Sequence, residues 1–293
     1  MHRKKVLALA AAWGAFLAGA WAAEPFSGSS ALSFTQKLVA FGPRPSGSPA
    51  SRKAQGYILA QLKLRGCEVI QDAFPAQTPL GPVPMLNLIA RFPGTSGRAV
   101  VISGHYETKS LPGINFVGAN DGGASAGFLL ELARVLAGRP LKHDVYLVWF
   151  DGEESFGPWS ESDGLHGSRH LAARWASEGT LSRIKALINV DMIGDRDLGI
   201  LEELNSTAWL RRLVRQTAAE TGLGRYFLNA GASIEDDHIP FLRRGVPAVD
   251  LIDFDYGPGN SWWHTERDTV DKLSADSFQV VGTVVLEALK RLE

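Results

Sequence analysis

Three carboxylates stand together where an apolar segment of the sequence ends. The stretch LVWFDGEES, residues 147–155, places Asp151, Glu153 and Glu154 directly after a run of large apolar residues. Neighbouring ionised carboxylates repel one another, and in a confined site each raises the pKa of the other. Such a cluster is stable when water solvates it, or when a cation and a proton share it. An isolated pair of glutamates is usually solvated, so the rest of the sequence must decide between these two interpretations.

Five further segments carry polar residues in a comparable setting. Three of them follow apolar stretches that resemble strands, and two are glycine-rich or tryptophan-rich loops. Ligand sites in open α/β sheets form beyond the carboxyl ends of the strands, so we expect all of these segments to surround one site. The five segments are 102–108, 189–195, 250–255, 116–125 and 260–268.

The residue types in these segments suit a zinc ion. Zinc binds carboxylate oxygens and imidazole nitrogens in roughly tetrahedral geometry, and a catalytic site keeps one position open. In the pair Glu153–Glu154, one glutamate can bind the metal while its neighbour stays free to transfer a proton. The two would face opposite ways in a regular strand, so the chain must turn there, and Gly152 permits that turn. The candidate ligands are His105, Asp121, Glu154, Asp191, His238 and His264.

Alternating patterns predict the elements that position these residues. Ser206 and Ser274 are expected to be N-caps of helices. Glu202 and Glu203 are expected to lie on a solvated face. The turn at 93–97 predicts a hairpin between the strands on either side of it. Helices are expected within 31–65, interrupted at 42–49, and at 123–137, 165–176, 207–221, 237–244 and 275–292. Strands are expected at 67–74, 85–92, 99–104, 144–150, 184–190 and 247–253.

The strand candidates decide the fold class. The runs VVIS, VYLVWF and ALINV are almost continuously apolar, which is typical of strands that are covered on both faces. Strands and helices alternate after residue 99, and no linker divides the chain. The sequence therefore predicts a three-layer α/β/α sandwich on a mixed, mostly parallel sheet, in a single domain.

The N-terminal residues have the organisation of a signal peptide. A basic start, MHRKK, precedes an apolar run, and small residues flank Trp21 at the spacing that a signal peptidase reads. We therefore expect a signal peptide at 1–22, a lead-in at 23–30 and a catalytic domain at 31–293, with export to the periplasm or the medium. An uncleaved anchor is the alternative, although the run is short for a membrane span.

Composition and charge argue against a nucleic-acid-binding protein. The 293 residues include 45% hydrophobic and 21% charged residues, with a net charge of −1. Loss of residues 1–22 removes Arg3, Lys4 and Lys5 and no acid, so the charge becomes −1 − 3 = −4. This charge provides no basic surface for nucleic acid. Cys67 is the only cysteine, so an internal disulfide is impossible, and the core must stabilise an exported chain unaided.

Several long strings resemble animal-type glutaminyl-peptide cyclotransferases. These are zinc enzymes that share their fold with the co-catalytic zinc aminopeptidases. The resemblance extends from about residue 31 to the C-terminus, and its most specific strings are GSRHLA and DDHIPFLRRGVP. The strings are GANDGGAS at 118–125, FDGEES at 150–155 with Trp159, SDGLHGSRHLA at 162–172, EDDHIPFLRRGVP at 235–247 and WHT at 263–265.

Position by position, the resemblance implies roles for individual residues. It implies that Asp121, Glu154 and His264 bind one zinc ion. It implies Glu153 as the general acid/base, with Asp191 and Asp236 as two catalytic aspartates, and Trp159 and Trp263 as walls of the substrate pocket. His238 matches no functional position and is interpreted as structural.

The chain departs from the family pattern at three places. Asp250 stands where the animal enzymes have a histidine, and it could contact the substrate. The loop between Ile252 and His264 is longer than theirs. The usual pocket phenylalanine has no clear counterpart, and Tyr256 or Trp262 could replace it.

The resemblance implies conversion of an N-terminal glutamine of a peptide or protein into pyroglutamate, with release of ammonia. A zinc aminopeptidase is the first alternative, because His105 could hold a second metal ion together with Asp121 and Asp191. A non-catalytic binding module is the second, although it would be expected to lack ligands or the general base. We expect a monomer with peptide substrates and no stable membrane partner.

Overall fold

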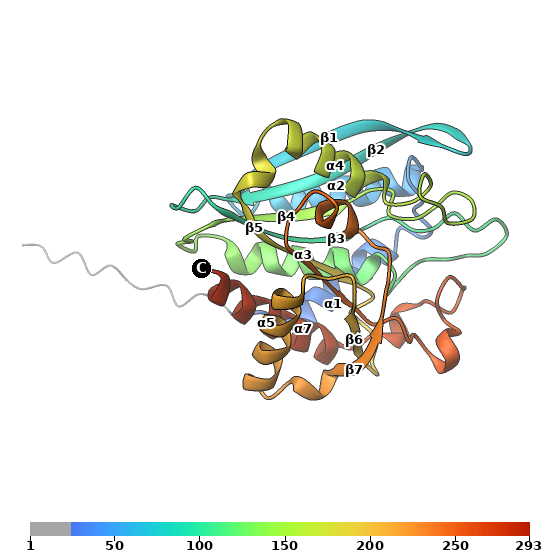
Figure 1. The fold of residues 1–293 in the computed structure, drawn as a ribbon. Helices are drawn as coiled ribbons and strands as arrows, with labels where there is room; N and C mark the ends of the chain where they lie inside the picture. The colour runs from blue at the N-terminus through green and yellow to red at the C-terminus, as the bar shows by residue number, and fades with distance from the viewer. Residues whose placement is uncertain (1–24) are drawn as a thin grey trace, which may run out of the picture.

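Six strands form the central sheet, in the order β1-β2-β4-β3-β5-β8 (Figure 1). This computed structural model describes residues 25–293. Strand β2 runs antiparallel to both of its neighbours, and the pairs β4–β3, β3–β5 and β5–β8 are parallel. The mixed, mostly parallel sheet is thereby confirmed. The strands are β1 (Glu68–Thr78), β2 (Gly81–Phe92), β3 (Ala99–His105), β4 (Asp144–Phe150), β5 (Ile184–Asp191) and β8 (Ala248–Ile252).

Helices cover both faces of this sheet, which confirms the three-layer sandwich. Figure 1 shows α4 on one side of the sheet and α1, α3 and α7 on the other. Two short strands, β6 (Ile200–Glu203) and β7 (Phe227–Ala232), form a separate parallel pair. The helices are α1 (Gly28–Val39), α2 (Pro49–Leu62), α3 (Gly123–Leu136), α4 (His166–Ser177), α5 (Ala208–Glu220), α6 (Ile239–Leu242) and α7 (Ala275–Leu292).

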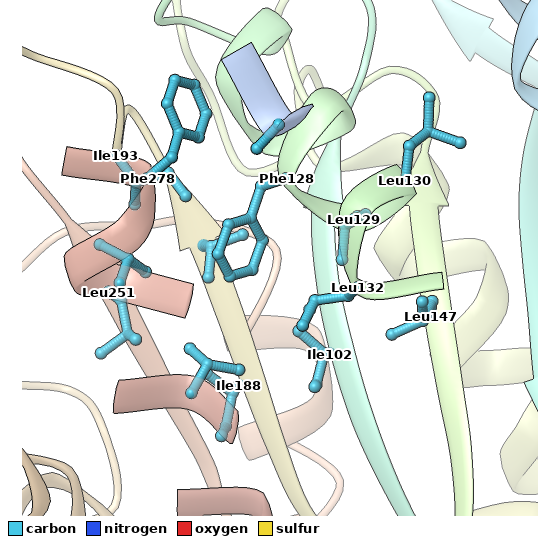
Figure 2. Close-up of a cluster of buried hydrophobic side chains, with 14 of the residues drawn as sticks. Ile102, Phe128, Leu129, Leu130, Leu132, Leu147, Ile188, Ile193, Leu251 and Phe278 are labelled. Carbon is cyan, nitrogen blue, oxygen red and sulfur yellow. The ribbon is translucent and has the colours of Figure 1, made fainter. Parts of the chain in front are cut away.

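Alternate residues of each central strand enter two different cores. In β3, Val100 and Ile102 join the larger core beneath α3 and α7, whereas Val101 joins the core beneath α4 and α6. Figure 2 shows the larger core, in which Phe128 of α3 and Phe278 of α7 lie over the strands. Burial on both faces explains why the sequence of these strands is continuously apolar. The carboxyl ends of the strands are thus held rigidly at one edge.

The predicted hairpin was placed at the wrong strands. Strand β2 pairs with β1 through a tight turn at residues 79–80, and it pairs with β4 on its other side. Strand β3 lies between β4 and β5, so the turn at 93–97 leads away from β2. The apolar side chains of β3 favour the middle of the sheet, where both faces are covered, over an outer hairpin.

The segment around β6 also differs from its prediction. Glu203 is buried, and its Oε2 lies 3.1 Å from His238 Nε2, so the assignment to a solvated face was wrong. Ser206 donates its hydroxyl to the same carboxylate at 2.7 Å, and Thr207 takes the N-cap position of α5. The structural role of His238 is confirmed by this buried pair. Ser274 accepts a hydrogen bond from Asp276 N and caps α7 as expected.

The predicted signal peptide lies outside the described residues. The side chain of Phe26 is buried against Phe128, and α1 begins at Gly28, so the folded domain includes residues that the sequence assigned to a lead-in. Within residues 25–293, no helix combines the length and the apolar character that crossing a membrane requires.

Candidate active site

The carboxyl ends of the central strands bring the predicted polar residues together. His105 is the last residue of β3, Asp191 is the last residue of β5, and Asp151 follows β4 directly. Asp121 precedes Gly122, the residue before α3. The site therefore lies at the edge of the sheet where the sequence placed it.

A clamped turn gives Glu153 and Glu154 their positions. Gly152 has a φ of 75°, in the left-handed region that favours glycine. The carbonyl oxygens of Gly152 and Glu153 accept hydrogen bonds from the backbone N–H groups of His166 and Leu165, at 2.6 and 2.7 Å. The start of α4 thus fixes the turn, and both glutamate side chains reach the same cavity.

Asp121, Glu154 and His264 form a candidate metal site. Their ligand atoms all lie within 4.8 Å of one another. His264 Nε2 is 2.8 Å from Glu154 Oε1 and 3.3 Å from Asp121 Oδ2, which is buried and accepts no hydrogen bond among the described residues. Two carboxylates and one imidazole are a donor set that suits zinc, so the residues fit the metal that the sequence predicted.

Aromatic contacts hold the histidine of this set. The ring of His264 stacks on Trp263 with 4.0 Å between centroids, and Phe116 approaches it edge-on at 5.6 Å. His264 also has a φ of 55°, which is uncommon for a residue other than glycine. Burial alone would lower the pKa of His264, but the adjacent carboxylates of Asp121 and Glu154 raise it to about 9.

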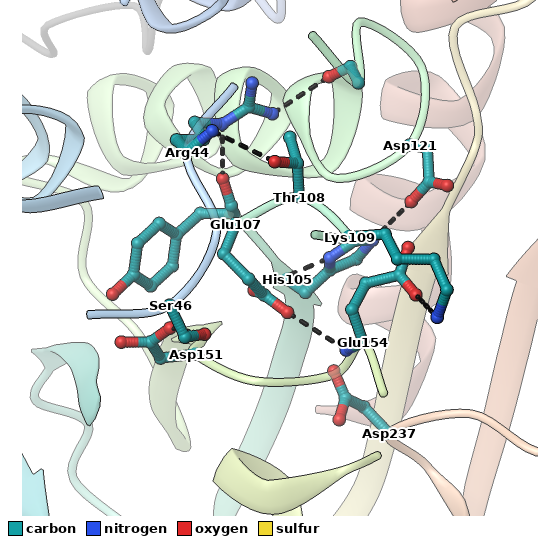
Figure 3. Close-up of polar contacts among 12 residues, drawn as sticks. Arg44, Ser46, His105, Glu107, Thr108, Lys109, Asp121, Asp151, Glu154 and Asp237 are labelled. Carbon is teal, nitrogen blue, oxygen red and sulfur yellow. Dashed lines mark hydrogen bonds and ion pairs between the residues drawn. The ribbon is translucent and has the colours of Figure 1, made fainter. Parts of the chain in front are cut away.

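Two charged residues that the sequence reading missed contact Glu154 (Figure 3). Lys109 Nζ donates to Glu154 Oε2 at 3.2 Å, and Glu107 Oε1 accepts a hydrogen bond from the backbone N–H of Glu154 at 3.1 Å. Both residues follow β3 in the segment HYETK, whose polar character was the available signal. Lys109 thus holds the side chain of Glu154, and Glu107 holds its backbone.

His105 lies beside a second acidic cluster. Its Nε2 is 3.2 Å from both Asp121 Oδ1 and Asp191 Oδ1, and its Nδ1 is 3.6 Å from Glu107 Oε2. Burial would lower the pKa of His105, but Asp191 and Glu107 raise it well above its ordinary value. The ring therefore lies against three carboxylates. It can interact with them as a cation, or it can be neutral and bind a metal ion together with Asp121 and Asp191.

Two further acids of the site, Glu153 and Asp191, have pKa values that are shifted toward the protonated form. Burial and the neighbouring carboxylate of Glu154 raise the pKa of Glu153 well above its ordinary range. Burial raises the pKa of Asp191 to about 7, although His105 opposes the shift. Asp236 is buried, and its Oδ2 accepts no hydrogen bond from the described residues. The raised pKa values of Glu153 and Asp191 suit groups that take up and return a proton, as general acid–base chemistry requires.

A cavity of about 560 Å³ opens over these residues. We call its acidic lining residues the acidic wall and its apolar lining residues the apolar wall. Trp159 and Trp263 belong to the apolar wall, as predicted, and Phe254 was missed because it lies in the loop that departs from the family pattern. The acidic wall consists of Asp121, Glu153, Glu154, Asp191 and Asp236. The apolar wall consists of Pro158, Trp159, Ile234, Ile252, Phe254 and Trp263.

Tyr256 does not line this cavity, so its prediction as a pocket aromatic was wrong. The side chain is fully buried, and its hydroxyl donates to Asp268 Oδ1 at 2.8 Å. Asp268 also accepts hydrogen bonds from the backbone N–H groups of Asn120 and Asp121, at 2.8 and 3.1 Å. Tyr256 thereby fixes the loop that carries a candidate metal ligand. Trp262, the other residue considered, packs on Tyr256 outside the cavity lining.

Asp250 likewise lies beneath the cavity and does not line it, so its predicted contact with the substrate was wrong. The residue is on β8, where Asn189 Nδ2 donates to its Oδ1 at 3.1 Å and its own N–H donates to Ser206 at 3.0 Å. Burial and the neighbouring Asp236 raise the pKa of Asp250 well above its ordinary value.

Comparison with known proteins identifies the family. The model of peptidase family M28 matches residues 87–289. A glutaminyl-peptide cyclotransferase of Drosophila melanogaster is 33% identical over 268 residues, which cover 82% of this chain and 75% of the relative. The chain belongs to the glutaminyl-peptide cyclotransferases of peptidase family M28.

Solved structures support the same placement. The crystal structure of a glutaminyl cyclase from an Acidobacteriales bacterium is 40% identical, with a TM-score of 0.89 and 99% coverage of both chains. A Zn-dependent exopeptidase from Parabacteroides distasonis is 26% identical, with a TM-score of 0.82 and coverage of 92% of this chain and 99% of that one. The cyclotransferase fold is thus shared with a zinc-dependent peptidase, and the residues of the site must distinguish the two activities.

Replacing Tyr256 with phenylalanine tests its supporting role. Tyr256→Phe removes one buried donor from Asp268, and we expect it to lower the free energy of unfolding by about 1–3 kcal/mol. Urea unfolding followed by fluorescence measures this change. Tyr226→Phe is the matched control, because the hydroxyl of Tyr226 contacts only the exposed Arg225 among the described side chains, and its effect should stay within about 0.5 kcal/mol. Equal effects of the two substitutions would contradict the assignment.

Proposed function

We propose that this protein converts N-terminal glutamine residues of peptides into pyroglutamate and releases ammonia. The observation that carries this proposal is the pairing of Glu153 with the candidate metal site of Asp121, Glu154 and His264, in a cavity whose other wall is aromatic. The curated relative and the bacterial structure that bear the names of this activity support it. The protein is then an acyltransferase with a peptidase-like fold.

The reaction is an intramolecular aminolysis. The α-amine nitrogen of the glutamine forms a bond to its own side-chain carbonyl carbon, the bond from that carbon to the amide nitrogen breaks, and ammonia leaves. One proton must move from the attacking nitrogen to the leaving nitrogen. The catalyst must therefore hold the carbonyl, hold the amine and carry that proton between them.

Glu153 is the residue we assign to proton transfer. Its side chain lines the cavity next to Glu154, and it is not one of the three ligands of the candidate metal site. It would accept the proton of the attacking amine and return it to the departing nitrogen. Asp191 and Asp236, on the same wall, would bind the leaving amide group.

Asp121, Glu154 and His264 would hold one zinc ion per chain. A bound zinc ion would act as a Lewis acid that polarises the carbonyl group. Lys109 and Glu107 would keep Glu154 oriented for this role, and Tyr256 would do the same for the Asp121 loop through Asp268. Three protein ligands leave a position open, as expected of a catalytic site.

The aromatic wall suits the substrate end of a peptide. Trp159, Phe254 and Trp263 offer flat apolar surface to one small side chain. The cavity binds one chain end better than an extended internal segment, because its acidic wall attracts a free α-ammonium group. These residues favour an N-terminal over an internal glutamine. We further propose export by the predicted signal peptide and a monomeric enzyme.

A zinc aminopeptidase is the competing function. The cluster of His105, Asp121 and Asp191 could hold a second metal ion, and this geometry is the specific observation in its favour. The cyclotransferase proposal instead keeps Asp191 for the substrate and His105 as a support for the surrounding carboxylates.

The proposal is tested by incubating the purified protein with two peptides that differ only in their first residue, glutamine or leucine. We expect ammonia and a pyroglutamyl peptide from the first and little free leucine from the second. Mass spectrometry and an ammonia assay measure both reactions. Release of leucine that far exceeds release of ammonia would favour the aminopeptidase.

Glu153→Gln removes the proton carrier and leaves the candidate ligands in place. We expect kcat to fall about 100-fold to 10,000-fold, as is typical for loss of a general acid–base residue. Zinc content, measured by atomic emission on the same samples, should stay at the wild-type level. Glu266→Gln, an exposed site, is the control and should retain full activity. Wild-type turnover of Glu153→Gln would remove Glu153 from this role.

A further inference from the structure

A second, smaller pocket adjoins the active-site cavity. It has a volume of about 100 Å³ and lies between the loop at 159–164, the start of α4 and the helix α6. Trp159 and Glu235 line both hollows, so these two side chains form the wall between them. When the first residue of a peptide occupies the large cavity, the following residues can extend over this wall toward the small pocket.

The charges of the two hollows are opposite. Most of the charged residues that line the active-site cavity are carboxylates. The small pocket is lined by three arginines, Arg169, Arg243 and Arg244, and by the glutamates Glu161 and Glu235. Arg243 Nη2 lies 3.3 Å from Glu235 Oε1, so that glutamate is already paired, and three positive charges face two negative ones.

Donor groups of these arginines remain available. A guanidinium group has five N–H donors. Arg244 is exposed, and among the described residues its Nη1 donates one hydrogen bond, to the carbonyl oxygen of Pro240 at 3.1 Å. Arg169 uses its Nη atoms on the carbonyl oxygens of Glu161 and Gly164, which closes the loop of the pocket. Burial and the nearby cation of Arg243 lower the pKa of Arg169, as expected where like charges gather.

We propose that this arginine pocket binds a carboxylate of the substrate peptide, downstream of the glutamine that reacts. The carboxylate belongs to an acidic side chain or to the C-terminus of a short peptide. The inference rests on the proposed function and adds a substrate preference to it. The acidic cavity attracts the α-ammonium group and the arginines attract the carboxylate, so a peptide with charges of both signs is oriented from its two ends.

Trp159 connects the two binding regions. Its indole N–H donates to Glu235 Oε2 at 3.4 Å, and its ring packs over Gly164, where a Cβ atom would lie 2.9 Å from the ring. Glu235 is in turn held by Arg243. One side of this unit faces the reacting residue and the other side faces the arginine pocket. Arg244 lies outside the unit, so it can be changed without removing the support of Trp159.

The test uses a set of peptides with amidated C-termini that begin with glutamine and carry glutamate, glutamine or lysine at one of the next four positions. We expect glutamate to raise kcat/KM over glutamine by about threefold to fivefold at one or two positions, the range of a partly exposed ion pair. Lysine at the same position should lower it. The preference should weaken as the salt concentration rises.

Substitutions then assign the preference to the pocket. Arg244→Gln should reduce the glutamate-to-glutamine ratio to near one. Arg212→Gln, which removes the same charge from an exposed position on α5, should retain the wild-type ratio. The proposal is overturned if no position gives a ratio above about two, or if Arg244→Gln keeps the preference.

The peptide with no downstream charge reports the cyclisation reaction separately. If that peptide is not turned over, the proposed function fails, and the pocket is tested by binding alone. Calorimetric titration with pyroglutamyl peptides then compares glutamate with glutamine at each position. A higher affinity for the glutamate peptide that is lost in Arg244→Gln supports the proposed pocket. Equal affinities for the glutamate and glutamine peptides overturn the proposal.

Discussion

The concentration of carboxylates at one edge of the sheet is the constraint on which this structure depends. Asp121, Asp191 and Asp236 are buried there together with Glu153 and Glu154. An isolated buried carboxylate is costly unless it is protonated, hydrogen-bonded or paired with a cation. The protein uses all three means. Some carboxylates of the site are therefore suited to hold a proton, and others are suited to bind a metal ion.

Buried cations provide part of this compensation. The guanidinium group of Arg44 is fully buried and donates to the carbonyl oxygens of Tyr106, Val117 and Gly118, which ties the loop before α2 to the two loops of the site (Figure 3). Burial lowers the pKa of Arg44 to about 10, so it remains charged at neutral pH. His105 neutralises the interior of the cluster. Asp121 and Glu154 share the imidazole of His264, with His105 beside Asp121 and Lys109 beside Glu154, and a bound cation there would add to this compensation.

The sequence predicted the location of the site because its signal is local. Apolar runs that end in Asp, Glu or His identify strand ends, and a parallel sheet brings such ends to one edge. The order of β2, β3 and β4 was not predictable in this way, because strand pairing depends on contacts between distant segments. Tyr256 and Glu203 were misassigned for a related reason. Each is buried by a partner far along the chain or across a loop, Asp268 and His238 respectively, and neither partner is marked by periodicity.

The metal requirement of the acidic edge is the central claim, and its most direct test is urea unfolding of chelated and zinc-loaded protein. With free zinc at about 100 times its Kd, we expect one bound ion to stabilise the wild type by about 2.7 kcal/mol. His105→Ala should retain this gain, and His264→Ala should lose it. Equal stability of the chelated and loaded wild type would contradict the account. So would two tightly bound ions, one of which is lost in His105→Ala.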